Sequence, residues 1–373
     1  MFSLRKLRDK MAFAFAAKIP TVKKLLDVYA ANGASVDIQA IFFKFTLDSI
    51  CDIAFGRGKE MNTLEVDHPF GNAFDQANAI CSRRFFVPSW LWKVKKLLNI
   101  GEENELRKHC SVIESFVNTI VTGRMADGAE SQQEGDLLSL FIEDNKKKNQ
   151  EITPKELRDV VMNFIIAGRD TTAWAMTATI MLLCQHPEVA DKAYAEVQDI
   201  LGSSQSDSAA DHQTTKDMPF LRAVISEALR LWPSVPSDVK QCLKDDELPS
   251  GVQVPAGCFV SYPIYSLSRR KDIWGEDAAE FKPERWLAGD TEREPFTEYK
   301  YPVFNAGLRI CLGREMAYLE CGILLSELLR RYKFSLAEHS AKWTAQKPPQ
   351  PVEFLVGATL SFENGLMCKL TPR

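Results

Sequence analysis

The longest helical pattern in the chain runs from Pro154 to Gln185, and it most constrains how the rest can fold. The run Thr153-Pro154-Lys155-Glu156 combines a capping box with proline at the first helical position. His186-Pro187 ends the pattern, because proline cannot continue a helix. At about 1.5 Å per residue such a helix extends roughly 48 Å. It would cross a whole domain, so we expect the other elements to pack around it.

Apolar residues at helical spacing predict further helices on both sides of this one. They cover 21–31, 36–55, 104–125, 188–201, 219–232 and 314–332. Segment 67–89 is interrupted by Pro69, Gly71 and Pro88, so a break is expected there. Polar or charged loops are expected over 127–135, 146–148 and 202–216.

The chain changes character after Pro233. Segments 248–257 and 258–267 alternate and turn like a β-hairpin, and 354–370 predicts a final hairpin with its turn at Glu363-Asn364-Gly365. Segment 272–293 mixes short helical turns with loop. No internal repeat and no linker is visible in the sequence. Residues 1–373 are therefore expected to form one mainly α domain of the α+β class.

Composition excludes some classes of function. With 373 residues, of which 45% are hydrophobic, the chain can build one large core or two ordinary ones. Its 46 Lys and Arg residues against 50 Asp and Glu residues give a net charge of -4, so nucleic-acid binding has little support. Nine cysteines stand singly, which is typical of reduced thiols rather than of a disulfide framework.

The sequence contains no stretch of the roughly 18 uninterrupted apolar residues that a membrane span needs. The basic run Arg5-Lys6-Leu7-Arg8, followed by apolar residues at 11–17, imitates a short signal or transit peptide. The same pattern fits an amphipathic helix that keeps its basic residues in water, and we prefer this interpretation.

A single cysteine near the C-terminal end stands in the run Phe304-Asn-Ala-Gly307-Leu-Arg309-Ile-Cys311-Leu-Gly313. Gly307 allows a tight bend, and Gly313 lets the start of the following helix approach a flat cofactor closely. Free N–H groups and the positive dipole end of that helix favour a negatively charged sulfur on Cys311. Most free cysteines are buried core residues, but the spacing at five positions argues against that interpretation here.

The middle of the long helix carries a second motif, Ala167-Gly168-Arg169-Asp170-Thr171-Thr172. The small residues at its start leave space beside the backbone, and threonine hydroxyls can bond back to the helix and loosen it locally. An acid followed by a hydroxyl can relay protons to a group bound in that space. A helix kink with a capped polar pair is the structural alternative.

The run from Phe304 to Gly313 resembles the haem-binding signature of the cytochrome P-450 superfamily, the haem-thiolate monooxygenases. The resemblance implies the cytochrome P-450 fold, with haem b as cofactor and Cys311 as the axial ligand of its iron. Arg309 would pair with a haem propionate, and Phe304, Gly307 and Gly313 would complete the loop around the cofactor.

The motif on the long helix resembles the oxygen-activation motif of the same superfamily. The resemblance implies Thr171 as the hydroxyl beside the O2 site and Asp170 as the acid that supplies protons. The substrate pocket would be lined by Phe164, Ile165 and Ala167 on this helix and by Val235 further along. Plain core packing explains each of these four residues at least as well.

Three charged residues have a structural role by the same resemblance. Glu227-Ala-Leu-Arg230 puts an acid and a base on one helix face, which alone means little because most such pairs are solvated. Pro283-Glu-Arg285-Trp286 follows later, and Arg285 is expected to meet Glu227 and Arg230 and lock the loop beneath the haem. Lys240 is a further candidate for a propionate contact, with a solvated lysine as the simpler expectation.

Several segments resemble one branch of the superfamily, the plant, algal and fungal fatty-acid ω-hydroxylases. They are 45–56, 90–96, 232–240, 245–251, 272–277 and 281–286. The resemblance implies hydroxylation of a fatty acid at or near its ω carbon, with O2 and NADPH. No Gly-x-Gly-x-x-Gly follows a strand, so NADPH and flavins are expected to act only through a separate cytochrome P-450 reductase. Arg314, Arg330 and Arg331 are candidates to face this reductase, and solvated helix charges are the alternative.

The family pattern is expected to begin well before residue 1, because its Trp-x-x-x-Arg motif, membrane anchor and first strands are not found. About the first quarter of a family member is therefore expected to be missing. The resemblance implies the cytosolic face of the endoplasmic reticulum membrane, with membrane association only through that N-terminal part. Two alternatives stay open: a monooxygenase of another apolar substrate, and a truncated haem-binding or inert fragment without turnover.

Overall fold

The computed structural model describes residues 5–56, 61–126, 136–149, 152–202, 210–288, 291–292, 296–337 and 354–373. Its helices are α1 (Arg5–Ala16), α2 (Ile19–Asn32), α3 (Ile38–Phe55), α4 (Pro69–Arg83), α5 (Ser89–Leu98), α6 (Glu102–Ala126), α7 (Leu137–Lys147), α8 (Pro154–Gln185), α9 (Pro187–Leu201), α10 (His212–Lys216), α11 (Pro219–Leu231), α12 (Ile264–Leu267), α13 (Lys271–Trp274) and α14 (Arg314–Arg331). Short 3-10 turns are η1 (Arg84–Phe86), η2 (Pro283–Trp286), η3 (Pro302–Phe304) and η4 (Gly307–Arg309).

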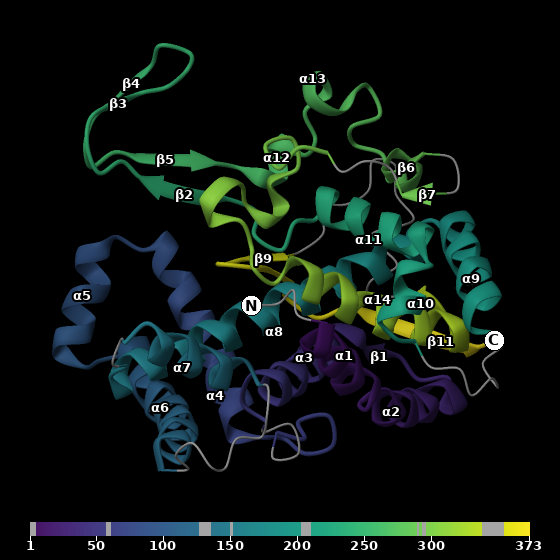
Figure 1. Ribbon diagram of the computed structural model, residues 1–373, viewed down its shortest axis with the longest axis horizontal. Helices are drawn as coiled ribbons and strands as arrows, with labels where there is room; N and C mark the ends of the chain where they lie inside the picture. The colour runs from purple at the N-terminus through teal and green to yellow at the C-terminus, as the bar shows by residue number, and fades with distance from the viewer. Residues whose placement is uncertain are drawn as a thin grey trace.

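Helix α8 crosses the molecule, and α3, α6, α11 and α14 all pack against it (Figure 1). Its start is the one that the sequence predicts. The Thr153 hydroxyl accepts from the Glu156 N–H at 3.2 Å, and the Glu156 carboxylate accepts from the Thr153 N–H at 2.8 Å. This reciprocal cap satisfies N–H groups that the first helical turn would otherwise leave unpaired.

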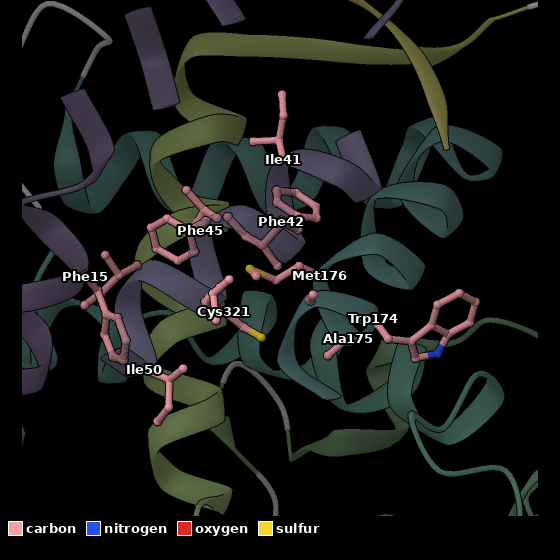
Figure 2. Close-up of a cluster of buried hydrophobic side chains, with 14 of the residues drawn as sticks. Phe15, Ile41, Phe42, Phe45, Ile50, Trp174, Ala175, Met176 and Cys321 are labelled. Atoms are coloured by element: carbon pink, nitrogen blue, oxygen red, sulfur yellow. The ribbon is translucent and has the colours of Figure 1, made fainter. Parts of the chain in front are cut away.

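The hydrophobic core lies between α1, α3, α8 and α14 (Figure 2). Phe15 from α1, Phe42 and Phe45 from α3, and Trp174 from α8 are fully buried there. The Trp174 indole N–H donates to the Trp232 carbonyl oxygen at 3.0 Å, so burial leaves this donor paired. Burying one large apolar side chain stabilises the fold by roughly 1.5–3 kcal/mol, and this core therefore fixes α8 in place.

Most helices predicted from spacing are confirmed. The predicted ranges correspond to α2, α3, α6, α9, α11 and α14, with ends that agree within two residues. A helix, α1, forms in the N-terminal stretch and buries Met11 and Phe15 while Asp9 stays exposed. That its basic residues lie in water stays a prediction. Among the helices of the described residues, none is both long enough and apolar enough to cross a bilayer.

The break predicted within 67–89 is wrong for its first part, where α4 forms. Pro69 is the first helical residue, a position at which no N–H is needed. The ring nitrogen Nδ1 of His68 caps the helix by accepting from the Phe70 N–H at 3.2 Å. Gly71 lies inside the helix, so glycine alone did not interrupt it.

Two predicted loops are partly helical. Helix α7 extends through Lys147, because ion pairs at i,i+4 spacing join Glu143 to Lys147 at 2.8 Å and Asp144 to Lys148 at 2.7 Å. Helix α10 forms at the end of the predicted loop 202–216, where Asp211 accepts from two backbone N–H groups. The predicted loop 127–135 and residues 203–209 lie outside the described residues.

Small antiparallel sheets complete the fold and confirm the mainly α, α+β class. One sheet has the order β1 (Val36–Asp37), β11 (Met367–Pro372), β8 (Tyr332–Leu336). The two-stranded pairs are β2 (Asp238–Gln241) with β5 (Phe259–Tyr262), β3 (Asp246–Glu247) with β4 (Gln253–Val254), β6 (Leu287–Ala288) with β7 (Thr291–Glu292), and β9 (Phe354–Val356) with β10 (Leu360–Phe362). The segment 272–293 contains the predicted helical turns, in α13 and η2, and also the strands β6 and β7, which were not predicted.

The hairpin predicted over 248–267 is replaced by a longer ribbon. Strands β2 and β3 lead outward and β4 and β5 return, so the turn lies at 249–251 (Figure 1). Gly251 supplies the left-handed residue of this turn, with φ of 82°. Gly257 also has a positive φ, of 85°, and lies between β4 and β5 on the returning side of the ribbon.

The C-terminal hairpin predicted over 354–370 is shorter than expected. Strands β9 and β10 pair with each other, with Val356 opposite Leu360. The predicted turn at 363–365 instead redirects the chain, so that β11 joins β8 and β1. Gly365 has a φ of 69° there, which favours glycine.

Candidate active site

A predominantly apolar cavity of about 470 Å³ lies between the centre of α8 and the loop before α14. The predicted site residues that line it are Phe164, Ala167, Thr171, Val235, Phe304, Arg309, Cys311 and Gly313. The structure thus brings the two sequence motifs, which are more than a hundred residues apart in the chain, to opposite walls of one space. Gly307 is near this loop but does not line the cavity.

The helical repeat decides which residues of α8 reach this cavity. Phe164, Ala167, Gly168 and Thr171 follow i, i+3, i+4 and i+7 spacing, so their side chains share one face. Ile165 lies on another face, is fully buried in the core and does not line the cavity. The expectation that Ile165 contacts substrate is therefore corrected to core packing.

Gly168 stands where α8 meets α3 closely. A Cβ atom at this position would lie 2.8 Å from both Cγ1 and Cδ1 of Ile50, closer than real side chains approach. Glycine is therefore the residue that fits here without a shift of α3. The Ile50 side chain occupies part of the space beside the glycine and also lines the cavity.

The Cys311 loop is held by its own backbone. The Cys311 N–H donates to the Phe304 carbonyl oxygen at 2.7 Å, and the Ile310 N–H donates to the Gly307 carbonyl oxygen at 3.1 Å. Gly307 takes a left-handed conformation, with φ of 62°, as the predicted tight bend requires. Asn305 is left-handed too, and its side-chain oxygen accepts from the next backbone N–H at 2.9 Å.

This loop presents a sulfur atom to the cavity. The Cys311 side chain is exposed, and within the described part of the chain its sulfur has no hydrogen-bond partner. A Cβ at Gly313 would lie 3.8 Å from Sγ, so the glycine keeps the side of the sulfur open. A flat apolar group with a metal at its centre fits between this sulfur and the apolar face of α8.

The charged groups of Arg309 and Lys240 have different neighbours. The Arg309 guanidinium is exposed at the cavity, and no ion pair involves it among the described residues. It is thus available for a carboxylate on a bound group. The Lys240 ammonium is 2.8 Å from the Asp238 carboxylate and does not line the cavity. The expectation that Lys240 reaches a propionate is not supported by this geometry.

The Thr171 hydroxyl makes the hydrogen bond back to its own helix that the sequence predicts. Its hydroxyl donates to the Ala167 carbonyl oxygen at 2.6 Å, one turn earlier. The Ser234 hydroxyl donates to the Thr171 carbonyl oxygen at 2.7 Å from the segment after α11. Both hydroxyls lie at the cavity wall, where polar groups are otherwise few.

Asp170 is buried next to this threonine but does not line the same cavity. Its carboxylate accepts from the Arg169 guanidinium at 3.0 Å and from the Asn78 side-chain amide at 3.0 Å. Burial raises the pKa of Asp170, and the charge of Arg169 opposes this effect. Arg169 is shared, because it also pairs with Asp75 on α4 at 2.6 Å.

A second, larger cavity reaches Asp170 from the other side. It has a volume of about 1110 Å³ and lies between α4, α5, α6 and α8. Thr171 lines the first cavity and Asp170 the second, so two consecutive residues of α8 face different spaces. The first cavity is called the inner cavity below, and the second the outer cavity.

The predicted contact of Glu227 with Arg230 and Arg285 is present, buried beneath the Cys311 side of the molecule. Arg230 donates to the Glu227 carboxylate from Nε at 2.7 Å and from Nη2 at 2.8 Å. Arg285 Nε donates to it at 2.8 Å. The Lys282 N–H and the Trp286 indole N–H donate at 3.0 and 2.9 Å.

Arg230 uses its remaining donors to fix loops. Its Nη1 donates to the carbonyl oxygens of Ser268 and Ala278, and its Nη2 to that of Glu280 at 3.0 Å. All five donors of the guanidinium are therefore used. This network joins α11 to η2 and the segment around Ala278, which supports the structural role predicted for these residues.

The three arginines proposed to face a partner lie in different settings. Arg314 is partly exposed and pairs with Glu315 at 3.2 Å. Arg330 is buried, where it pairs with Glu327 at 2.7 Å, so it cannot meet a partner. Arg331 pairs with Asp27 at 2.7 Å. Arg314 and Arg331 are both partly exposed, so of the three only Arg330 is excluded from the predicted surface role.

Sequence analysis missed the residues that surround Asp170. Asn78 and Asp75 lie about ninety positions earlier in the chain, and nothing in their local pattern points to Asp170. Arg169 is part of the motif described for the long helix. An arginine next to an acid in that motif was the feature of the sequence from which their contact could have been predicted. The rings of Phe43 and Phe74 lie 5.0 and 5.1 Å from this guanidinium.

Comparison with known proteins agrees with this geometry. The family profile described as Cytochrome P450 matches residues 14–359. Cytochrome P450 704B1 of Arabidopsis thaliana is 36% identical, over 100% of this chain and 76% of that protein. Cytochrome P450 704C1 of Pinus taeda is 33% identical over 100% and 74%, and cytochrome P450 86B1 of Arabidopsis thaliana is 32% identical over 94% and 63%. The family match includes both walls of the inner cavity, so the chain belongs to the cytochrome P450 family of haem-thiolate monooxygenases.

Proposed function

We propose that the protein hydroxylates a fatty acid at or near its ω carbon, using O2 and electrons that reach it from NADPH through a separate reductase. The observation that carries this proposal is the opposition of Cys311 to Thr171 and Gly168 across an apolar cavity. The resemblance of several segments to fatty-acid ω-hydroxylases supports the choice of substrate. The apolar lining supports a substrate whose reacting end is a hydrocarbon.

The residues of the inner cavity suit the cofactor of the family. Haem b, when bound, supplies the activation of O2, with the Cys311 sulfur as ligand of its iron. Arg309 pairs with a propionate carboxylate, since its guanidinium has no other acid among the described residues. Gly313 keeps the approach to the sulfur open.

Asp170 and Thr171 move protons from the outer cavity to the inner one. Burial raises the pKa of Asp170, so this carboxyl holds a proton more readily than an exposed one does. The hydrogen bonds from Arg169 and Asn78 fix the carboxyl at the outer cavity. The Thr171 hydroxyl, at the wall of the inner cavity, can accept a proton from this side and donate one onward.

Apolar residues exclude water and orient the substrate. Phe164, Ala167 and Val235 line the inner cavity and would contact the hydrocarbon near its reacting carbon. Packing against these side chains positions a carbon atom but offers no hydrogen bond to it. The site therefore fits hydroxylation of an unactivated chain better than recognition of a polar group.

The partner and location follow the same proposal. The reductase would supply electrons at the Cys311 side, where Arg314 is partly exposed. The endoplasmic reticulum membrane is the proposed location by resemblance to the plant family members. A fragment that binds haem without turnover is the alternative function, and the same assay distinguishes it.

The test is turnover of the haem-loaded chain with a cytochrome P450 reductase, NADPH and hexadecanoic acid, with products identified by mass spectrometry. We expect a hydroxy acid with oxygen at or near the methyl end. Oxidation of other apolar compounds with none of hexadecanoate would contradict the substrate. A correct haem spectrum without any turnover would favour the inert alternative.

A further inference from the structure

The β2–β5 ribbon contacts the Cys311 loop at the wall of the inner cavity. Asp238, the first residue of β2, and Asn305, the second residue of the loop motif, both line this cavity. The Asn305 side-chain amide donates to the Asp238 carboxylate at 3.1 Å. The contact lies next to Phe304, whose carbonyl oxygen accepts from the Cys311 N–H. A residue of the ribbon therefore holds the backbone position at which the loop begins.

The Asp238 carboxylate is itself fixed by the sheet. Its Oδ2 atom accepts from the Tyr262 hydroxyl and from the Lys240 ammonium, the latter at 2.8 Å. Tyr262 stands directly opposite Asp238 in the pairing of β2 with β5, so strand register places the hydroxyl there. Burial acts to raise the pKa of Asp238, but the hydrogen bonds from Lys240 and Tyr262 lower it below its usual value. The carboxylate is therefore charged at neutral pH and accepts from Asn305.

Asn305 uses its whole side chain to hold an uncommon backbone conformation. Its φ of 64° is left-handed, which few residues other than glycine adopt and which asparagine tolerates better than most. Its Oδ1 atom accepts from the Ala306 N–H at 2.9 Å, while its amide nitrogen donates to Asp238. The Tyr262 hydroxyl lies 3.2 Å from the same Oδ1 atom. The first corner of the Cys311 loop is thus tied to the ribbon through one side chain.

We propose that Asp238 is a positioning residue for the haem ligand: through Asn305 it fixes the start of the Cys311 loop and thereby the direction of the Cys311 sulfur. It acts through the loop backbone and not on the sulfur itself. Hydrogen-bond partners behind a ligating residue orient it, and their loss weakens the bond to the metal. This inference rests on Cys311 as the iron ligand and is independent of the proposed substrate.

The test follows the thiolate band of the haem-loaded, reduced and carbon monoxide-treated chain in urea below the unfolding transition. The rate at which this band converts to that of a neutral thiol ligand is measured for Asp238→Asn, Asn305→Asp and the combined variant. Asn305→Asp places two like charges in contact, so conversion should be about tenfold faster. The combined variant again sets an amide opposite a carboxylate, and its rate should return to within about threefold of wild type.

Two further variants separate the side-chain contact from other effects. Asn305→Gly keeps the left-handed backbone but loses the contact with Asp238, so conversion should again be faster than in wild type. Asp246→Asn is the control and should not change the rate. This exposed acid belongs to β3 of the same ribbon, does not line the inner cavity and, within the described part of the chain, accepts only from the Glu247 N–H.

Wild-type rates in both Asn305→Asp and Asn305→Gly would overturn the proposal, because the loop would then be held by its backbone alone. Faster conversion in the single variants without recovery in the combined variant would also overturn it, since the pair would not be what holds the loop. Hydrogen exchange of the Cys311 amide gives a second readout, and it should be faster in Asn305→Gly. None of these measurements involves a substrate, so absence of hexadecanoate hydroxylation would reject the proposed function and leave this inference intact.

Discussion

Two buried carboxylates, Glu227 on α11 and Asp170 on α8, differ in how completely their charge is met. Glu227 is fully buried and accepts from Arg230, Arg285, the Lys282 N–H and the Trp286 indole. Among the described residues, Asp170 accepts only from Arg169 and Asn78, and its arginine is shared with another acid. Glu227 is enclosed by donors, whereas Asp170 reaches a cavity.

This difference separates a structural acid from one that can exchange protons. A carboxylate surrounded by charged donors gains a fixed geometry, and removing it takes from Arg230 and Arg285 the carboxylate that both bind. Desolvation raises the pKa of a buried carboxyl that has few donors. Such a carboxyl therefore loses its proton at a pH closer to neutral. Burial alone therefore does not identify function; the number and charge of the donors do.

The largest effect is expected at Glu227. Replacing it by alanine strands Arg230 and Arg285 in a buried place, so Glu227→Ala should lower the free energy of unfolding by about 3–5 kcal/mol. Denaturant unfolding of the purified chain measures this. Glu315→Ala is the control, because this exposed acid pairs at the surface and should cost about 1 kcal/mol or less.

Equal losses in the two variants would break the comparison, since Glu227 would then be no more structural than a surface acid. A failure of Glu227→Ala to fold at all agrees with the prediction. In that case Glu227→Gln, which keeps the shape and most acceptors, should give a measurable intermediate loss.

Asp48 offers a third buried carboxylate, and no cation of the described residues forms an ion pair with it. It accepts from the Thr63 N–H and hydroxyl and from the Leu64 N–H, at 2.9, 2.7 and 3.2 Å. Burial raises the pKa of Asp48 from 3.8 to about 6 despite these hydrogen bonds. Its folded-state pKa lies above the unfolded one, so its contribution to stability is present below pH 3.8 and is lost as the pH rises through about 6.

Asp48→Asn should remove that pH dependence. Between about pH 4 and pH 7, the stability difference between wild type and variant should shift in favour of the variant by about 3 kcal/mol. Thermal or denaturant unfolding at several pH values measures the slope. A constant difference across this range would show that Asp48 does not take up a proton on folding.

Asp170→Asn tests the exchangeable member of the pair. The amide cannot carry a proton between the cavities, so product formation should fall about a hundredfold while folding is nearly unchanged. The measurements are product formed per NADPH consumed and the unfolding free energy of the same sample. A stability loss as large as that of Glu227→Ala, with unchanged turnover, would reverse the roles assigned to the two acids.

The smallest effect is expected at Asn78. Its amide donates to Asp170 and lowers the pKa of this acid, so Asn78→Ala should raise that pKa further. The hydrogen bond from Asn78 opposes the effect of burial on this pKa, and its loss removes that opposition. The limb of the pH profile of coupled turnover that reports Asp170 should therefore move to higher pH. An unmoved profile would show that Asn78 does not position the acid.

The sequence predicted those parts of the molecule whose signals are local. The cap at Thr153, the period of α8 and the spacing of Glu227 and Arg230 each depend on residues within a few turns of one another. The run around Cys311 was specific enough to predict the cavity wall. In the structure, the helix ends lie within two residues of the ends that these local patterns predict.

The rest depends on distant contacts that no local pattern contains. The β2–β5 ribbon turns at Gly251, because the pairing of β3 with β4 places the turn there, whereas the local sequence contains two glycines, Gly251 and Gly257, that both allow left-handed backbone. Ile165 and Ala167 are two residues apart, yet only the packing of α8 decides that one faces the core. Asn78 contacts Asp170, and the outer cavity forms, only when α4 and α6 pack over α8.

The central claim is that Cys311 holds a haem iron in the inner cavity. The most direct measurement is the absorbance spectrum of the reduced, carbon monoxide-treated chain, for wild type and for Cys311→Ser. We expect a red-shifted thiolate band in wild type and its loss in the variant. A thiolate band that persists without Cys311, or a wild-type band typical of a histidine ligand, would show that Cys311 is not the ligand of the iron.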